Sequence, residues 1–277
     1  MFRKILIIVN PVTLFLLFNI ITPKEMSLYE KVMELEKIEY VNIGSSHGLR
    51  AFNYSYFDNS VNLGFGSQRM YYGLKVLESI EPLLDSSSTI IIPISVFSFC
   101  GFFDGPKQRY LGFLSREELG ISLGEEILEL HFPYLGINNT ESIFYGQDEE
   151  VIKFLDNGFE RAKNHLSRAH KCNIIDESIV EQLRKFIERN SDKNIVFLIT
   201  PYYRTYWDEI LLEREIVERI YDIVNEIVDE YSLALFDYSE DERFKNNSEL
   251  FRDSDHLNTD GAILFTKIVI DELTILA

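Results

Sequence analysis

The hydrophobic positions of this chain fall into short continuous runs that alternate with longer, periodic segments. Thr89–Ser95 and Asn194–Thr200 are near-continuous apolar runs, as strands covered on both faces of a sheet are. Three shorter β-rich runs accompany them. We therefore expect five strands, at Tyr40–Gly44, Ser60–Leu63, Thr89–Ser95, Asn194–Thr200 and Leu233–Tyr238.

Helix-like segments fill most of the intervals between these runs. In one of them, the apolar residues Ile216, Ile220, Ile223, Val224 and Ile227 form a stripe along a helix face. Helices are expected at Leu49–Tyr54, Gln68–Leu84, Ile179–Arg189, Ile210–Tyr231 and Asp260–Leu276, with a short helix inside Glu25–Lys37. Strands that alternate with helices favour a three-layer α/β/α fold around a five-stranded parallel sheet. Ligands of such sheets lie at the carboxyl ends of the strands.

The N-terminal segment has the pattern of a membrane anchor. Arg3 and Lys4 precede the uncharged stretch Ile5–Pro23, which is just long enough to span a hydrocarbon core as a helix, with a kink expected at Pro11. The stretch lacks alanine and an A-x-A-like site, so an uncleaved anchor is favoured over a cleaved signal peptide. The positive charges place the rest of the chain outside the cytoplasm. The alternative is an apolar element of the folded domain, at residues 5–21.

We divide the chain into a signal anchor at residues 1–24 and one domain at residues 25–277. Within that domain, residues 97–175 interrupt the alternation with an aromatic-rich insertion. An insertion of this length is typical either of a lid or substrate-binding subdomain, or of extra packing over a sheet edge. Its basic part, Arg161–Lys171, is interpreted as a solvated helix face. The two cysteines, Cys100 and Cys172, are compatible with a disulfide but do not indicate one.

Charge narrows the range of functions. The formal charge of −18 and the pI near 4.7 argue against a general binder of nucleic acid or anionic lipid, because this surface repels phosphate. The sequence contains no phosphate-binding glycine loop and no His/Cys cluster with ligand spacing. We expect no nucleotide, flavin or metal cofactor.

Candidate chemistry lies at the two ends of the domain. Gly44-Ser45-Ser46-His47 follows the first predicted strand, and Asp253-x-x-His256 precedes the last predicted helix. A serine hydroxyl becomes a nucleophile when an imidazole takes its proton, and a carboxylate fixes the tautomer and orientation of that imidazole. Three residues of spacing let Asp253 reach the far ring nitrogen of His256. The two motifs together predict a Ser-His-Asp system.

These motifs, in this order, resemble the SGNH/GDSL hydrolase superfamily over residues 38–277. The chain looks most like its divergent, membrane-anchored bacterial branch, which has G-S-S-[HE] in place of G-D-S. The resemblance implies a flavodoxin-like sheet, with Ser46 as nucleophile and Asp253 and His256 completing the triad. It also implies that the oxyanion hole takes backbone N–H groups from Ser46 and from Gly66, with Ser67 as the alternative to Gly66. His47 is expected to have a structural or substrate-contact role.

The chain departs from the family pattern at the third block, which is normally G-x-N after the third strand. The corresponding stretch, Ile92–Ser98, contains no asparagine, so Ser95 or Ser98 is the candidate replacement donor unless the hole keeps only two donors. After the fourth strand, Tyr203 and Arg204 are candidate substrate contacts, and aromatic packing of a proline-containing loop is the alternative.

Two functions of different class follow. The first is transfer or hydrolysis of an acyl ester on a cell-envelope glycan through acyl-Ser46. By analogy with the anchored relatives, such an enzyme works beside a membrane-bound O-acyltransferase. The second is a catalytically silent scaffold or glycan-binding protein of a polysaccharide-synthesis complex, which the missing asparagine motivates. A cytoplasmic lipase or esterase is the third option if residues 5–21 belong to the core.

Overall fold

The computed structural model describes residues 28–55, 57–100, 113–115, 117, 157–171 and 175–276. Its centre is a parallel sheet with the strand order β2-β1-β3-β4-β5, which is the flavodoxin-like order. The strands are β1 (Tyr40–Asn42), β2 (Ser60–Asn62), β3 (Thr89–Ile94), β4 (Asn194–Ile199) and β5 (Ala234–Asp237). All five predicted strands are confirmed, and each is one or two residues shorter than its apolar run. A separate antiparallel pair joins β6 (Phe251–Asp253) to β7 (His256–Leu257).

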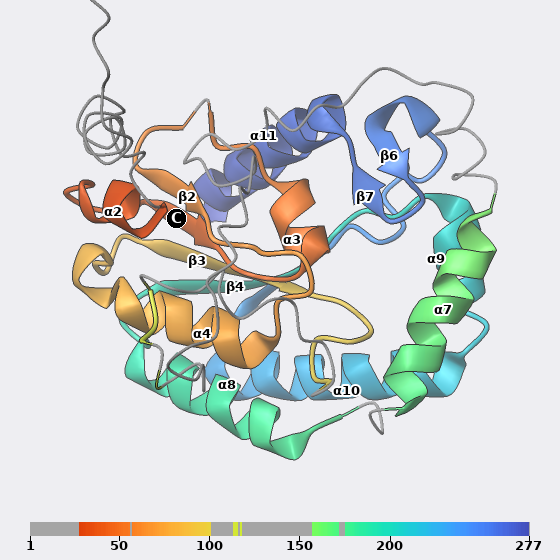
Figure 1. Cartoon of the computed structure of the whole chain (residues 1–277), viewed down its shortest axis with the longest axis horizontal. Coiled ribbons are helices and arrows are strands. Elements are labelled where there is room, and N and C mark those ends of the chain that lie inside the picture. The colour runs from red at the N-terminus through yellow and green to blue at the C-terminus, as the bar shows by residue number, and fades with distance from the viewer. Residues whose placement is uncertain are drawn as a thin grey trace, which may run out of the picture.

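Helices cover both faces of the sheet, as Figure 1 shows. On one face lie α3 (Ser46–Ala51) and α11 (Thr259–Leu276), and on the other lie α4 (Met70–Ser79), α8 (Glu177–Arg189) and α10 (Arg214–Tyr231). The three-layer α/β/α prediction is thereby confirmed. The remaining helical elements are α2 (Leu28–Met33), α7 (Gly158–Lys171), α9 (Arg204–Ile210) and the 3-10 turns η1 (Glu81–Leu83) and η3 (Ser248–Leu250).

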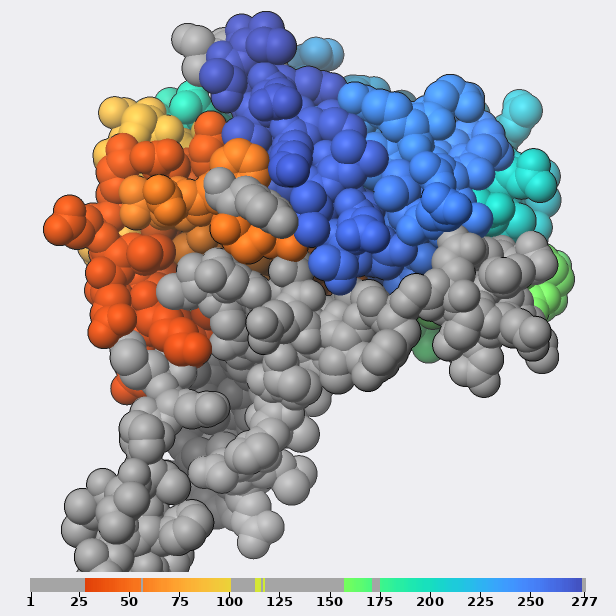
Figure 2. Space-filling model, turned by 90° about the horizontal axis from the view of Figure 1, so that it is seen from above, coloured from red at the N-terminus to blue at the C-terminus, as the bar shows by residue number. Residues whose placement is uncertain are grey.

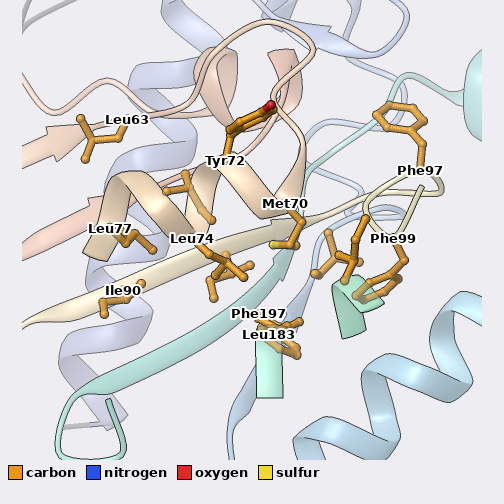
Figure 3. Close-up of a cluster of buried hydrophobic side chains, with 14 of the residues drawn as sticks. Leu63, Met70, Tyr72, Leu74, Leu77, Ile90, Phe97, Phe99, Leu183 and Phe197 are labelled. Atoms are coloured by element: carbon orange, nitrogen blue, oxygen red, sulfur yellow. The ribbon is translucent and has the colours of Figure 1, made fainter. Parts of the chain in front are cut away.

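The core is divided between the two faces. Under α4 and α8, Leu74, Leu77, Leu183 and Phe197 belong to one continuous buried cluster (Figure 3). On the opposite face, α3 and α11 cover a second cluster that includes Phe265. Figure 2, seen from above relative to Figure 1, shows α11 in dark blue directly beside the orange N-terminal segments. The C-terminal helix therefore holds the segment that follows β1.

Two glycines and a proline shape the chain beside β1. Gly44 has φ +120°, a backbone conformation that side chains disfavour. A Cβ on Gly48 would lie 3.1 Å from Pro93 Cγ and against the carbonyl oxygen of Ile43. Pro93 is tolerated in a central strand because the pairing of β1 with β3 ends at Asn42 and Ile91. The resulting close approach puts α3 directly on the ends of β1 and β3.

Several helix boundaries differ from the prediction. The helix after β1 begins at Ser46 instead of Leu49. The predicted Gln68–Leu84 helix ends at Ser79 and continues as η1, whose Pro82 removes a backbone donor. A separate helix, α9, precedes α10.

Two other predictions fall wholly or partly outside the described residues. Of the aromatic-rich insertion, Phe97, Phe99 and Phe113 are packed in the core, and residues 101–112, 116, 118–156 and 172–174 lie outside the described part. The predicted membrane anchor also lies outside it. Within the described part, no helix is both long and apolar enough to cross a membrane.

Candidate active site

Asp253 and His256 form the predicted acid–imidazole pair. They are cross-strand partners in β6 and β7, joined by the two-residue turn Ser254–Asp255. Directly opposite residues of an antiparallel pair place their side chains together on one face. His256 Nδ1 lies 2.9 Å from Asp253 Oδ1 and 3.0 Å from Oδ2. A proton held on Nδ1 by this carboxylate leaves Nε2 as the acceptor, and Nε2 is buried without a hydrogen-bond partner among the described residues.

Ser46 is the first residue of α3 and is partly exposed. The next residue, His47, is buried, and its ring centroid lies 5.2 Å from that of His256. The helix that starts at Ser46 also packs against β7, the strand that starts at His256. The structure thus brings the serine turn and the imidazole together from opposite ends of the domain. It does not join them by a hydrogen bond, because His256 Nε2 has no partner in the described part.

Two asparagines, the buried Asn42 and the half-buried Asn62, fix the position of α3. Asn42 Nδ2 donates to the carbonyl oxygens of Ile43 and Gly48 and to Asn62 Oδ1, at 3.0–3.2 Å. Asn62 Nδ2 donates in turn to the carbonyl oxygens of Leu49 and Phe52, both at 3.0 Å. Polar residues at the ends of β1 and β2 therefore hold the serine helix by its backbone. Nothing in the sequence pattern set these two asparagines apart from surface residues.

The loop predicted to supply an oxyanion donor lies beside the serine turn. Phe65 N donates to the carbonyl oxygen of Gly44 at 2.9 Å, and Gly44 N donates to Gln68 Oε1 at 2.5 Å. These bonds bracket the two candidate donors: Gly66 is partly buried, and Ser67 is exposed with φ +59°. The placement agrees with a role for either residue, and the donor itself stays a prediction.

The serines after β3 line a small pocket next to the same turn. Ser98 Oγ accepts a hydrogen bond from Ser95 N at 2.8 Å and lies 3.3 Å from Ser95 Oγ. Both serines line the pocket together with Gly44, Ser45 and Gln68. Ser98 is thus placed where the missing asparagine of the third block was expected, and its role stays a prediction.

Tyr203 and Arg204, the candidate substrate contacts, lie at the start of α9. Arg204 is exposed, and the ring of Tyr203 packs against Phe251 at 5.7 Å between centroids. Among the described residues, neither side chain is hydrogen-bonded to the serine turn or to the Asp253–His256 pair. The preceding residue, Tyr202, is the buried one, and its ring lies 5.5 Å from that of His47.

Helix α7 contributes two site residues that the sequence analysis assigned to a solvated face. Arg161 Nε donates to Asp255 Oδ1, and Arg161 Nη2 lies 3.2 Å from His256 Nδ1. One turn later, His165 Nδ1 lies 2.9 Å from the hydroxyl oxygen of Tyr206 and 3.8 Å from Asp255 Oδ2. The interpretation of Arg161–Lys171 as a solvated face is therefore wrong for these two residues. The exposed Lys163, Arg168 and His170 do match it.

Asp255 is the centre of this arrangement. Its side chain is fully buried, and its Oδ2 lies 2.9 Å from His47 Nε2. Burial alone would raise the pKa of Asp255. The neighbouring His256, the hydrogen bond from His47 and the charge of Arg161 outweigh burial and hold that pKa well below its usual range. The carboxylate is therefore ionised at neutral pH and is compensated by Arg161.

The imidazoles around Asp255 are kept neutral. Burial lowers the pKa of His165 to about 3 and also lowers the pKa of His47. Arg161 adds positive charge beside both rings, which opposes their protonation further. At neutral pH the cluster of His47, His165, Asp255 and Arg161 thus carries one negative and one positive charge.

One group in the described part has the spacing of metal ligands. Donor atoms of His47, Asp255 and His256 all lie within 4.8 Å of one another. However, Arg161 contacts both Asp255 and His256, and its guanidinium supplies the positive charge that a cation would bring. A divalent ion at this place would lie against a fixed like charge, so the donor set does not fit a metal.

Comparisons with known proteins give distant structural similarity. No family model matches the chain, and no curated protein does. A Streptococcus pneumonia structure described as a platelet activating factor is similar with a TM-score of 0.44 at 14% identity, covering 96% of this chain and 100% of the other. A lipase/acylhydrolase from Enterococcus faecalis has a TM-score of 0.43 at 11% identity, covering 85% of this chain and 95% of the other. A structure described as an acylhydrolase, from Bacteroides fragilis, has a TM-score of 0.44 at 11% identity, covering 90% of this chain and 94% of the other.

Proposed function

We propose that this protein moves acyl groups at esters through an acyl-Ser46 intermediate, in the manner of an SGNH-type esterase or O-acyltransferase. The observation that carries the proposal is the Asp253–His256 pair, with its 2.9 Å hydrogen bond and a buried Nε2 that no other described group uses. A neutral imidazole held this way is a proton acceptor beside the helix that begins at Ser46.

The reaction runs in two balanced halves. Ser46 Oγ bonds to the carbonyl carbon of the ester while its proton passes to His256 Nε2. The tetrahedral intermediate then loses the alcohol, which takes that proton. In the second half an acceptor hydroxyl gives its proton to His256 Nε2 and attacks the acyl carbon. The bond from that carbon to Ser46 Oγ then breaks, and Ser46 Oγ takes the proton back from His256. Water as acceptor makes the enzyme an esterase, and a sugar hydroxyl makes it a transferase.

The negative charge of each tetrahedral intermediate needs hydrogen-bond donors at its oxygen. We assign this task to the backbone N–H groups of Ser46 and Gly66, with Ser67 as the alternative to Gly66. The hydroxyl of Ser98 is the third donor, since it lines the pocket beside Gly44 and Ser45. In this proposal the two backbone donors form the hole, and Ser98 adds to it.

We further propose that the domain acts outside the cytoplasm on an acylated cell-envelope glycan, tethered by residues 1–24 next to a membrane-bound O-acyltransferase. The N-terminal pattern supports this location, because Arg3 and Lys4 precede an uncharged stretch and positive charge favours the cytoplasmic side. The strongly acidic composition supports a partner that is not an anionic lipid surface.

The direct test is covalent labelling with a fluorophosphonate, read by intact mass. The wild-type chain is expected to gain one adduct, Ser46→Ala to gain none, and the neighbouring control Ser45→Ala to label as wild type does. An adduct that survives in Ser46→Ala but disappears in Ser45→Ala would move the nucleophile by one residue. No adduct on folded wild-type protein would contradict the proposal and favour the silent scaffold.

The glycan assignment has its own test in the source cell. Ser46→Ala at normal protein abundance should abolish envelope O-acylation. Unchanged acylation in that variant, together with its loss on deletion of the domain, would mean a scaffold role.

A further inference from the structure

The residue after Ser46 and the residue before His256 are hydrogen-bonded to each other. His47 is the neighbour of Ser46, and Asp255 is the neighbour of His256. His47 Nε2 lies 2.9 Å from Asp255 Oδ2, across 208 positions of sequence. The proposed catalytic pair is thus flanked by a second histidine–carboxylate pair that the triad mechanism does not use.

This second pair is more deeply enclosed than the first. His47 is 4% exposed and Asp255 is 2% exposed. The ring of His47 packs against those of Phe97 and Tyr202, at 5.4 and 5.5 Å between centroids. In this packed arrangement Nε2 faces the carboxylate of Asp255. Nδ1 is buried and without a hydrogen-bond partner in the described part.

The other oxygen of Asp255 is bound from a different element. Arg161, on α7, contacts Oδ1 and reaches His256 Nδ1 as well. Tyr203 N donates to the carbonyl oxygen of Ser254 at 3.0 Å, which ties the same turn to the start of α9. The turn of the β6–β7 hairpin is therefore held from three sides, and His47 is its only link, among these bonds, to the helix of Ser46.

We propose that His47 and Asp255 are positioning residues, which hold Ser46 and His256 at reacting distance by bonding the two elements that carry them. This inference rests on the proposed function and concerns the same site. His47 does not take part in proton transfer in this scheme, because its Nε2–H is committed to Asp255. Arg161 supplies the charge that lets Asp255 remain ionised in a buried place.

Two variants of His47 with side chains of different length separate the positioning role from two alternatives, a catalytic base and a residue that only fills space. In His47→Gln the side-chain amide extends far enough to donate to Asp255 Oδ2, whereas in His47→Asn the amide is one carbon shorter and does not reach. Both replacements remove the imidazole and keep a buried polar group. A residue that acts as the catalytic base loses its function equally in both, and a residue that only fills space affects stability and not the rate of the folded protein.

The experiment measures the second-order rate of fluorophosphonate modification of Ser46 across pH, on full-length protein whose folding is checked by circular dichroism. His47→Asn should be about 10- to 100-fold slower than wild type, since small misplacements of reacting groups cost this much. His47→Gln should recover most of that loss, with an unchanged midpoint of the rate–pH profile. The control His170→Ala, an exposed histidine on α7, should label at the wild-type rate.

The outcomes separate the inference from the function it rests on. Equal rates for wild type and folded His47→Asn would overturn the positioning role and leave the acyl-enzyme proposal intact. Loss of labelling in both His47 variants, with a lost pH midpoint, would overturn it by making His47 the base. Wild-type protein that does not label would contradict the proposed function and, with it, this inference. If His47→Asn does not fold, His47→Gln against Asp255→Asn makes the same comparison.

Discussion

Asp253 and His256 face each other across a two-residue turn, with Nδ1 of the imidazole 2.9 Å from the nearer carboxylate oxygen. The D-x-x-H spacing is thereby explained by a hairpin, in which directly opposed residues share a face. The geometry fixes the proton on Nδ1 and turns Nε2 away from the carboxylate.

Removal of the negative charge of Asp253 should disable the site without unfolding it. Asp253→Asn keeps the size of the side chain but no longer enforces the tautomer that leaves Nε2 free. Labelling of Ser46 by a fluorophosphonate is expected to slow by about 10²- to 10⁴-fold, as in serine triads that lose this carboxylate. Asp229→Asn, at an exposed position of α10, should label normally. Equal rates for both variants would remove Asp253 from the mechanism.

The neutral imidazoles around Asp255 predict a loss of stability in mild acid. The folded pKa of His165 is about 3, below its unfolded value, so the unfolded chain binds a proton that the folded chain refuses. The stability that the neutral His165 contributes is therefore fully present above about pH 6.5, and it is lost as the pH falls from there toward 3. At pH 5 the contribution of His165 is a loss of up to about 2 kcal/mol.

Urea unfolding of wild type and His165→Asn at pH 7.5 and pH 5 measures this contribution. The variant should lose less stability between the two pH values, because asparagine does not titrate. His170→Ala is the control, since His170 is exposed. Parallel pH dependences for wild type and His165→Asn would contradict the buried, neutral state of His165.

The asparagine pair beneath α3 should contribute measurably to folding. Asn42→Ala leaves the carbonyl oxygens of Ile43 and Gly48 without the side-chain donor they have now. We expect a loss of about 1–3 kcal/mol in the free energy of unfolding, the usual cost of unsatisfied buried polar groups. The exposed Asn225→Ala serves as control. A loss no larger than that of the control would show that water replaces Asn42 at these carbonyls.

The first residue of α7 has no room for a side chain. A Cβ on Gly158 would lie 2.8 Å from Ser254 Cβ and 2.9 Å from Tyr206 N. Helix propensity alone predicts that Gly158→Ala stabilises the protein by up to about 1 kcal/mol. Crowding predicts the opposite, a loss of about 1–3 kcal/mol. Thermal or urea unfolding decides between them, with Asn164→Ala, at an exposed position within the same helix, as the control. A stabilised Gly158→Ala would refute the close packing of α7.

The sheet was predictable because its strands are apolar on both faces. Thr89–Ile94 and Asn194–Ile199 are recognisable from the sequence alone, since every residue except Asn194 is buried. The Asp253–His256 contact was equally predictable, because it is local and depends only on a short turn. Helix starts were less certain, and the start at Ser46 depends on Gly44 and on the close approach of Pro93 to Gly48.

The contribution of α7 to the site was not predictable in the same way. Arg161 and His165 are one turn apart, and whether that face meets solvent or protein depends on where the helix packs. A signal was present, since Ala162, Leu166 and Ala169 form a buried stripe with helical spacing, and Arg161 and His165 border it. The role of Asp255 was not predicted either, because the D-x-x-H spacing draws attention to Asp253. Sequence spacing does not show that the turn residue Asp255 contacts His47 of α3.

The bond between His47 and Asp255 spans 208 positions, and it gives the order of synthesis a chemical consequence. A chain that is still emerging from the ribosome has its serine long before it has the hairpin that supplies the imidazole. In the proposed mechanism, Ser46 is an ordinary hydroxyl until β6, β7 and α11 have docked. The proposed reactivity therefore requires the segment from β6 to α11, and we expect copies that lack this segment to be inert toward a fluorophosphonate.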